Sequence, residues 1–239
     1  MSERVAAAGR TPQAEHRPGL IAVDGSAASG KSTVGRRLAE RLGDRFLDTG
    51  VMYRAVTWAA LDRTVDVHDA DALSNLASSI DMRVELPDAG TAAHARIVID
   101  GRNVTQDLRS PAVDENVSFV SRVPGVRDAL VRRQRNIADK GRIVMAGRDI
   151  GTVVLPDAEL KIYLDASPEE RARRRHAEFV RSGRKASEDD VLQDLRRRDQ
   201  IDSERAVSPL RAADDAVVLN TDAMTSDEVL DEVMKLVKR

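Results

Sequence analysis

The most constraining feature of the sequence is an eight-residue segment, residues 25–32, with the spacing G-x-x-x-x-G-K-[ST]. Gly25 and Gly30 permit the tight backbone conformations of a loop whose successive N–H groups converge on one anion. In such a loop Lys31 reaches the β- and γ-phosphates of a nucleotide, and the Ser32 hydroxyl binds Mg²⁺. The residues expected to bind the nucleoside triphosphate are Gly25, Ser26, Ala27, Ala28, Ser29, Gly30, Lys31, Ser32 and Thr33.

The residues on either side of this loop supply the context that the motif requires. The apolar run at residues 20–23 (LIAV) precedes it and is typical of a strand buried on both faces. Val34, Leu38 and Leu42 follow it at helical spacing. The N-terminus of that helix would add its partial positive charge to the loop. A Gly-rich turn before an ordinary helix is the alternative, but the context favours a nucleotide site.

Short apolar runs and helical patterns alternate along the rest of the chain. This alternation is typical of right-handed βαβ units and of a doubly wound sheet. We therefore predict an α/β fold with a parallel five-stranded sheet flanked by helices. The other expected strands are residues 143–146 (IVMA), 160–164 (LKIYL) and 216–219 (AVVL), with a weaker one around residues 46–47.

Residues 82–105 interrupt the alternation. Residues 83–86 and 96–100 each read as a strand, and Asp100-Gly101 is typical of a hairpin turn. Antiparallel strands within an alternating chain indicate a small inserted β subdomain.

Two helix starts carry the pattern of a capping box. Ser167 and Thr225 are expected to be N-caps, and each is followed three residues later by a glutamate, Glu170 or Glu228. In a capping box the glutamate side chain accepts a hydrogen bond from the backbone of the N-cap residue.

The composition excludes several classes of protein. The 239 residues include no cysteine, so neither a disulfide framework nor a thiolate metal site exists. The net charge of -2 and the aromatic content of 3 % argue against a nucleic-acid partner. No apolar run approaches the roughly 20 residues that span a bilayer. We expect a cytoplasmic protein without membrane contact, and residues 1–18 read as a disordered tail.

Arginines are concentrated in residues 168–207, with acidic residues among them. A solvated helix face is the usual meaning of such a charge run. Some of these arginines could instead close over a γ-phosphate, where guanidinium groups stabilise charge and water is excluded. We therefore predict an Arg-rich helical lid.

Four segments together give the chain a specific resemblance to bacterial-type cytidylate kinases, which are nucleoside monophosphate kinases. They are residues 48–55 (DTGVMYRA), 146–154 (AGRDIGTVV), 171–174 (RARR) and 198–205 (RDQIDSER). The resemblance implies a P-loop kinase domain over residues 19–239, with a monophosphate-binding insertion at 75–112 and the lid at 168–207. Ser26 and Val51 replace the Pro and Ala common in the family, but neither position supplies a side chain to the chemistry.

The resemblance also implies an activity and a set of residues. The protein would transfer the γ-phosphoryl group of ATP to CMP or dCMP with Mg²⁺ bound through Ser32, and we expect a monomer. The catalytic residues would be Lys31, Arg148, Arg171, Arg174 and Arg198. The acceptor-binding residues would be Thr49, Arg54, Ser118, Arg127, Arg148, Asp149, Arg198, Asp202 and Arg205.

Several alternatives stay open at the level of sequence. Asp149 could accept a hydrogen bond from the cytosine amine, or assist Mg²⁺ in the manner of a Walker-B carboxylate, because it follows the strand at 143–146. Asp202 could contact the acceptor or form an i,i+4 ion pair with Arg198. The acceptor could be UMP or AMP, and a regulatory P-loop NTPase is a more distant alternative.

Overall fold

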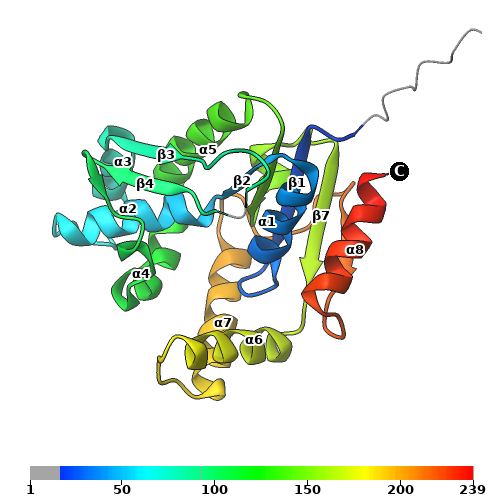
Figure 1. The fold of residues 1–239 in the computed structure, drawn as a ribbon. Helices are drawn as coiled ribbons and strands as arrows, with labels where there is room; N and C mark the ends of the chain where they lie inside the picture. The colour runs from blue at the N-terminus through cyan, green and yellow to red at the C-terminus, as the bar shows by residue number, and fades with distance from the viewer. Residues whose placement is uncertain (1–16, 92, 239) are drawn as a thin grey trace, which may run out of the picture.

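The computed structural model describes residues 17–91 and 93–238. Its centre is a five-stranded parallel sheet with the strand order β2-β6-β1-β7-β8, which confirms the predicted fold class (Figure 1). The strands are β1 (Leu20–Gly25), β2 (Arg45–Asp48), β6 (Ile143–Gly147), β7 (Leu160–Asp165) and β8 (Val217–Asn220).

Helices cover both faces of this sheet. Along β1 the side chains alternate, because Ile21 and Val23 pack on the α1 and α8 side while Ala22 packs on the α2, α3 and α5 side. The helices are α1 (Lys31–Leu42), α2 (Gly50–Asp62), α3 (Ala70–Ser79), α4 (Pro111–Ser121), α5 (Pro124–Ala138), α6 (Pro168–Arg181), α7 (Glu188–Glu204) and α8 (Ser226–Val237). Two short turns of helix complete the set, the 3₁₀ segment η1 (Asp107–Arg109) and the π-helical segment η2 (Ile150–Val154).

The predicted insertion is a separate three-stranded antiparallel sheet. It consists of β3 (Met82–Glu85), β4 (Arg96–Ile99) and β5 (Arg102–Asn103) in that order. Asp100 and Gly101 form the turn between β4 and β5 with φ angles of 47° and 81°. Positive φ at both central residues is the backbone that a tight hairpin of this kind requires. Ile97 and Ile99 pack this sheet onto the core beside α2.

Of the two predicted capping boxes, only the one at α8 is complete. Thr225 and Glu228 exchange both hydrogen bonds. At α6 the Ser167 hydroxyl accepts a hydrogen bond from the Glu170 N–H, as predicted. The second predicted bond, from the Ser167 N–H to the Glu170 side chain, is wrong. The Glu170 carboxylate accepts instead from two arginines of the next turn, and Asp222 accepts from the Ser167 N–H. Charge-assisted bonds to guanidinium groups are stronger than a bond to a neutral amide.

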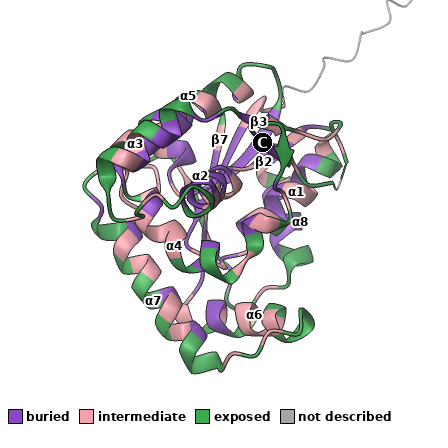
Figure 2. Cartoon of the chain, turned by 90° about the vertical axis from the view of Figure 1, so that its left-hand side faces the viewer, coloured by how far each residue is buried: buried purple, intermediate pink, exposed green. Residues whose placement is uncertain are grey.

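Helices α6 and α7 project from the sheet as a hairpin (Figure 1), and much of their surface is exposed (Figure 2). Ala172, Val191 and Leu195 form a small apolar core between them. This hairpin corresponds to the predicted lid. None of the helices within the described ranges is long and apolar enough to span a membrane.

Most of the predicted N-terminal tail lies outside the described residues. Arg17 and Pro18, its last two residues, are held in place: Arg17 pairs with the buried carboxylate of Asp44 at 2.7 Å, and Arg142 donates to the carbonyl of Arg17 at 3.1 Å. These two residues of the predicted tail are therefore anchored to the domain.

Candidate active site

The phosphate-binding loop connects β1 to α1 and has the backbone that its glycines allow. Gly30 has a φ of 94°, and a Cβ atom on Gly25 would lie 2.4 Å from the carbonyl oxygen of Leu164. No residue with a side chain fits at Gly25 without moving the backbone of β7. The Lys31 ammonium donates to the carbonyl of Ser26 at 2.8 Å, so it folds back across the loop.

Lys31 is buried, and this burial lowers its pKa to about 8. Arg148 adds to the shift by repulsion, while Asp48, Asp202 and Asp24 oppose it. Arg148 belongs to the segment expected to bind the acceptor. Its influence on Lys31 therefore places the donor loop and the acceptor segment in electrostatic contact.

Asp48 is a site residue that the sequence analysis did not single out. The Ser32 hydroxyl donates to its carboxylate at 2.6 Å, and the N–H of Gly50 donates to the other carboxylate oxygen at 3.0 Å. A hydroxyl and a carboxylate are the oxygen ligands that Mg²⁺ prefers, so the pair fits the ion expected here. In the described part of the chain no group of three or more acidic or histidine side chains could hold a metal. The available signal was the position of Asp48 at the end of an apolar strand.

A pocket opens beside the loop, and all nine residues predicted to bind the acceptor line it, so we call it the acceptor pocket. It lies between α2, α4 and α5 on one side and the end of β6 and α7 on the other. The full lining is Thr49, Gly50, Tyr53, Arg54, Val117, Ser118, Ser121, Arg127, Gly147, Arg148, Asp149, Arg198, Asp202 and Arg205. Five of these were not predicted: Gly50, Tyr53, Val117, Ser121 and Gly147. Residues 75–112 contribute nothing to the lining among the described residues, so their predicted role in binding the monophosphate stays a prediction.

One wall of the acceptor pocket is a buried ion pair between Arg127 and Asp149. The two side chains are 2 % and 5 % exposed, and Arg127 donates to the Asp149 carboxylate. Arg127 also donates to the carbonyl of Ser121 at 3.0 Å and lies over the ring of Tyr53. These contacts hold the Asp149 carboxylate in the pocket. The carboxylate that contacts Ser32, in contrast, is Asp48.

A second wall contains Arg148, Asp202 and Arg205. Arg148 donates to the Asp202 carboxylate, which raises the pKa of Arg148, and Arg205 lies 3.6 Å from the other carboxylate oxygen. The alternative pairing of Asp202 with Arg198 is wrong, because Arg198 pairs with Asp194 at 2.8 Å. An acidic residue four positions before a basic one is the favoured order on a helix.

Two predicted lid arginines lie against the phosphate-binding loop. Arg171 donates to the carbonyl of Ala27 at 3.2 Å and to Asp199 at 2.6 Å. Arg174 donates to the carbonyl of Thr221 at 2.6 Å, and its guanidinium lies 4.0 Å from the place a Gly30 side chain would begin. Other arginines of the segment form exposed ion pairs, as a solvated face predicts: Arg173 with Glu170, Arg196 with Glu169 and Arg197 with Asp194.

Asp24, the residue before the loop, connects the donor and acceptor segments. Its buried carboxylate accepts the N–H groups of Ile150 at 2.8 Å and Gly151 at 2.7 Å, directly after the pocket residues Arg148 and Asp149. Burial raises the pKa of Asp24 to about 6, against the lowering effect of these two hydrogen bonds. The sequence analysis missed this role, although an acidic residue at the end of a buried strand was visible.

A triphosphate loop on a central strand, an adjoining arginine-lined pocket and an arginine-bearing helical lid define a P-loop phosphotransferase. The family model for cytidylate kinase matches residues 21–239, and the chain belongs to the cytidylate kinase family.

Several curated relatives are similar over nearly their whole length. The cytidylate kinase of Anoxybacillus flavithermus is 48 % identical over 218 residues, which cover 91 % of this chain and 95 % of the relative. That of Nocardia farcinica is 48 % identical over 225 residues, 93 % and 95 % of the two chains. A solved shikimate kinase from Bacteroides thetaiotaomicron covers 92 % of this chain and 98 % of its own. At 14 % identity and a TM-score of 0.48 it carries no argument about function.

Proposed function

We propose that this protein transfers the γ-phosphoryl group of ATP to CMP or dCMP, yielding ADP and CDP or dCDP. The observation that carries the proposal is the convergence of all nine predicted acceptor-binding residues on one pocket beside the phosphate-binding loop. The names of the relatives, cytidylate kinases at 48 % identity, agree with this acceptor.

The donor side of the reaction rests on the loop and the lid. Loop N–H groups and Lys31 bind the β- and γ-phosphates of ATP, and Arg171 and Arg174 approach from the lid. Ser32 and Asp48 would hold Mg²⁺, which neutralises phosphate charge when it is bound. These groups place positive charge where the transition state spreads negative charge over the equatorial oxygens.

The acceptor side needs no general base. The second pKa of a phosphate monoester is about 6, so CMP is mostly a dianion at neutral pH. An acceptor phosphate oxygen forms the new P–O bond in line with the bond that breaks between the γ-phosphorus and the β–γ bridging oxygen, and ADP departs. Arg54, Arg148 and Arg198 hold the acceptor phosphate in that line.

Base selection is assigned to Asp149. A carboxylate accepts a hydrogen bond from the exocyclic amine of cytosine and repels the carbonyl oxygen that uracil has at the same place. The ion pair with Arg127 fixes the Asp149 carboxylate in the wall of the pocket. The ion pair of Arg127 and Asp149 therefore favours CMP over UMP as the acceptor.

An acceptor panel tests the proposal. ADP release is measured with CMP, dCMP, UMP and AMP, with Mg²⁺ and again with excess EDTA, which should abolish turnover. We expect CMP or dCMP to lead, and Asp149→Asn to reduce the ratio of CMP to UMP use. Asp139→Asn, at the surface end of α5, is the matched control.

A different outcome would overturn the assignment. A wild-type preference for UMP would contradict the role of Asp149, and turnover that required nucleic acid would favour a regulatory or nucleic-acid-dependent NTPase. The expected monomer corresponds to a mass of 26.2 kDa by light scattering. The cytoplasmic location stays a prediction.

A further inference from the structure

Asp114 is a buried carboxylate outside the predicted site. It lies in the first turn of α4 and is 6 % exposed. A buried ionised carboxylate destabilises a protein unless it is paired. Burial would by itself raise the pKa of Asp114, but Arg54 and Arg184 lower it below its usual value. The surroundings are therefore arranged to keep this carboxylate charged.

Guanidinium groups from separate parts of the chain converge on it. Arg54 of α2 lies 2.7 Å from one carboxylate oxygen. Arg184, in the turn between α6 and α7, donates to the other at 2.9 Å. Arg175 of α6 lies 3.8 Å away. We call Asp114, Arg54 and Arg184 the Asp114 latch.

The latch joins the lid to the acceptor pocket. Arg54 lines the pocket and also donates to the carbonyl of Leu108 at 3.0 Å. Arg198, another pocket residue, donates to the main-chain carbonyl of Asp114 at 2.6 Å. One residue of α4 therefore contacts two pocket arginines and the turn of the lid.

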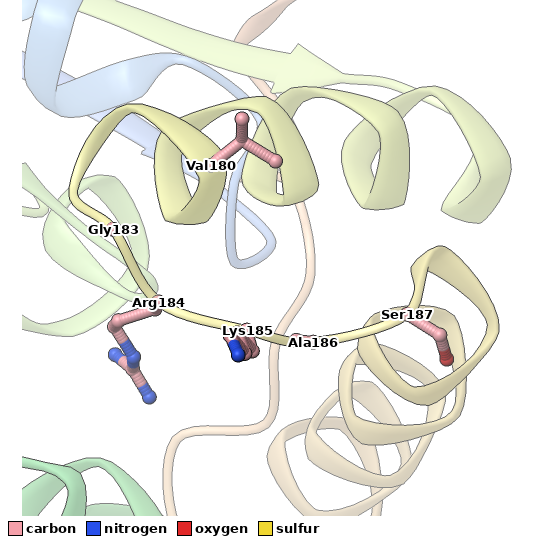
Figure 3. Close-up of a pocket in the computed structure, with 6 residues that line it drawn as sticks. All are labelled: Val180, Gly183, Arg184, Lys185, Ala186 and Ser187. Atoms are coloured by element: carbon pink, nitrogen blue, oxygen red, sulfur yellow. The ribbon is translucent and has the colours of Figure 1, made fainter.

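The lid end of the latch lies in an open turn of the chain. Gly183, with a φ of 74°, reverses the chain after α6 (Figure 3), and the Arg184 guanidinium lies over the ring of Phe179 in α6, 4.1 Å from its centroid. Val180, Gly183, Arg184, Lys185, Ala186 and Ser187 line a shallow hollow here. Val180 is 61 % exposed, whereas Phe179 and Ala186 pack against the small apolar core of the hairpin. Among the described contacts, the ion pair between Arg184 and Asp114 connects this turn to α4.

We propose that Asp114 is a positioning residue that orients Arg54 for the acceptor phosphate and tethers the lid turn to α4 through Arg184. The inference rests on the proposed function for its kinetic part only. An arginine side chain loses rotamer entropy when it is fixed in one orientation. With Arg54 oriented beforehand, acceptor binding does not bear that loss. A tethered lid likewise reduces the ordering that accompanies closure.

A double-mutant cycle tests the coupling. We expect Asp114→Asn to lower kcat/KM for CMP about tenfold, mainly through KM, and Arg184→Gln to lower it about threefold. In the Asp114→Asn background Arg184→Gln should have no further effect, because its partner is already gone. The KM for ATP should stay within about twofold throughout. Glu115→Gln and Lys185→Gln, exposed neighbours on α4 and in the turn, should match the wild type.

Hydrogen exchange of the backbone amides of residues 182–187 provides a readout independent of catalysis. Without nucleotides, exchange in this turn should be faster in Asp114→Asn and Arg184→Gln than in the two control variants. Arg184 is partly exposed, so its variant tests the tether without threatening the fold.

Two results would overturn the inference: kinetic effects that multiply independently, or exchange in the turn that is unchanged by both variants. If the wild type failed to phosphorylate CMP, the proposed function would be lost, and the exchange comparison would then decide the tether by itself.

Discussion

At the scale of single residues, Lys31 has the least ordinary environment of the donor site. Its buried ammonium donates a hydrogen bond to the carbonyl of Ser26 and is repelled by the positive charge of Arg148. A bound triphosphate would satisfy this charge, because it brings anionic oxygens to the place where the protein supplies few. The residue is therefore adapted to a ligand more than to stability.

Replacement of Lys31 by Ala should lower turnover by orders of magnitude and leave the fold intact. The reason is that a preorganised charge on the transferring phosphoryl contributes to the transition state. Steady-state kinetics together with circular dichroism would check this. Near-normal turnover would remove Lys31 from the mechanism.

The lowered pKa of Lys31 predicts an alkaline limit on ATP capture. A lysine is charged below its pKa. The kcat/KM for ATP should therefore fall as the pH rises through about 8, the pKa of Lys31 in the free enzyme. Bound phosphates favour the charged form, so kcat at saturating ATP should lose this limb. Arg stays charged at these pH values, and Lys31→Arg should therefore lack the limb. The same alkaline limb in Lys31→Arg would assign it to another group.

Residues within contiguous motifs were predictable, and residues that act through tertiary contacts were not. The nine positions predicted to bind the acceptor line one pocket, and most of them lie in segments that resemble a known family. Asp24, Asp48 and Asp114 act through partners distant in sequence, and no local pattern indicates such a pairing. Asp202 shows the same limit, since its partner Arg148 is 54 positions away and displaced the local i,i+4 alternative.

At the scale of elements, the five strands were visible as apolar runs, but their order was not. The sequence of a strand that is buried on both faces does not indicate which strands pair with it. The position of β6 between β2 and β1 therefore comes only from the structure. At α6 Ser167 is the N-cap as predicted, but the second bond of the predicted capping box, from the Ser167 N–H to the Glu170 side chain, is absent for a related reason. Arginines that are neighbours on the helix surface compete for Glu170.

Packing between α3 and α5 gives a testable element-level prediction. A Cβ atom on Gly125 would lie 2.3 Å from the Ser74 hydroxyl and 2.5 Å from its Cβ atom. Gly125→Ala should therefore lower the free energy of unfolding by about 1–3 kcal/mol, since overpacking forces the two helices apart.

Urea denaturation measures that effect, and the double variant Gly125→Ala with Ser74→Gly should recover part of the loss. The recovery is partial because glycine within a helix costs about 1 kcal/mol. No recovery would show that the contact with Ser74 is not the cause.

At the scale of the whole molecule, the chain has a net charge of -2, although arginines dominate the site and the lid. Carboxylates face these arginines throughout, as with Asp202 at Arg148 and Asp199 at Arg171. The local positive potential is thus available to nucleotides without a basic surface overall. This distribution agrees with small anionic substrates.

The lid predicts a clear difference between transfer and hydrolysis. Because Arg171 already contacts the phosphate-binding loop, a closed lid should exclude water from the γ-phosphate. ADP release without an acceptor should be at least about 100-fold slower than with CMP. Comparable rates would mean that the lid does not protect the donor.

The phosphate-binding loop and the segment with Arg148 and Asp149 follow two adjacent central strands, and this has a consequence for heat inactivation. β1 leads into the donor loop, β6 leads into Arg148 and Asp149, and Asp24 joins them by two hydrogen bonds. Partial openings of a protein begin at its weakly packed periphery, so they would release the α6–α7 hairpin before they separated these two strands. An enzyme warmed just below its melting temperature should therefore still bind nucleotide while its turnover fades, and the two activities should disappear in that order.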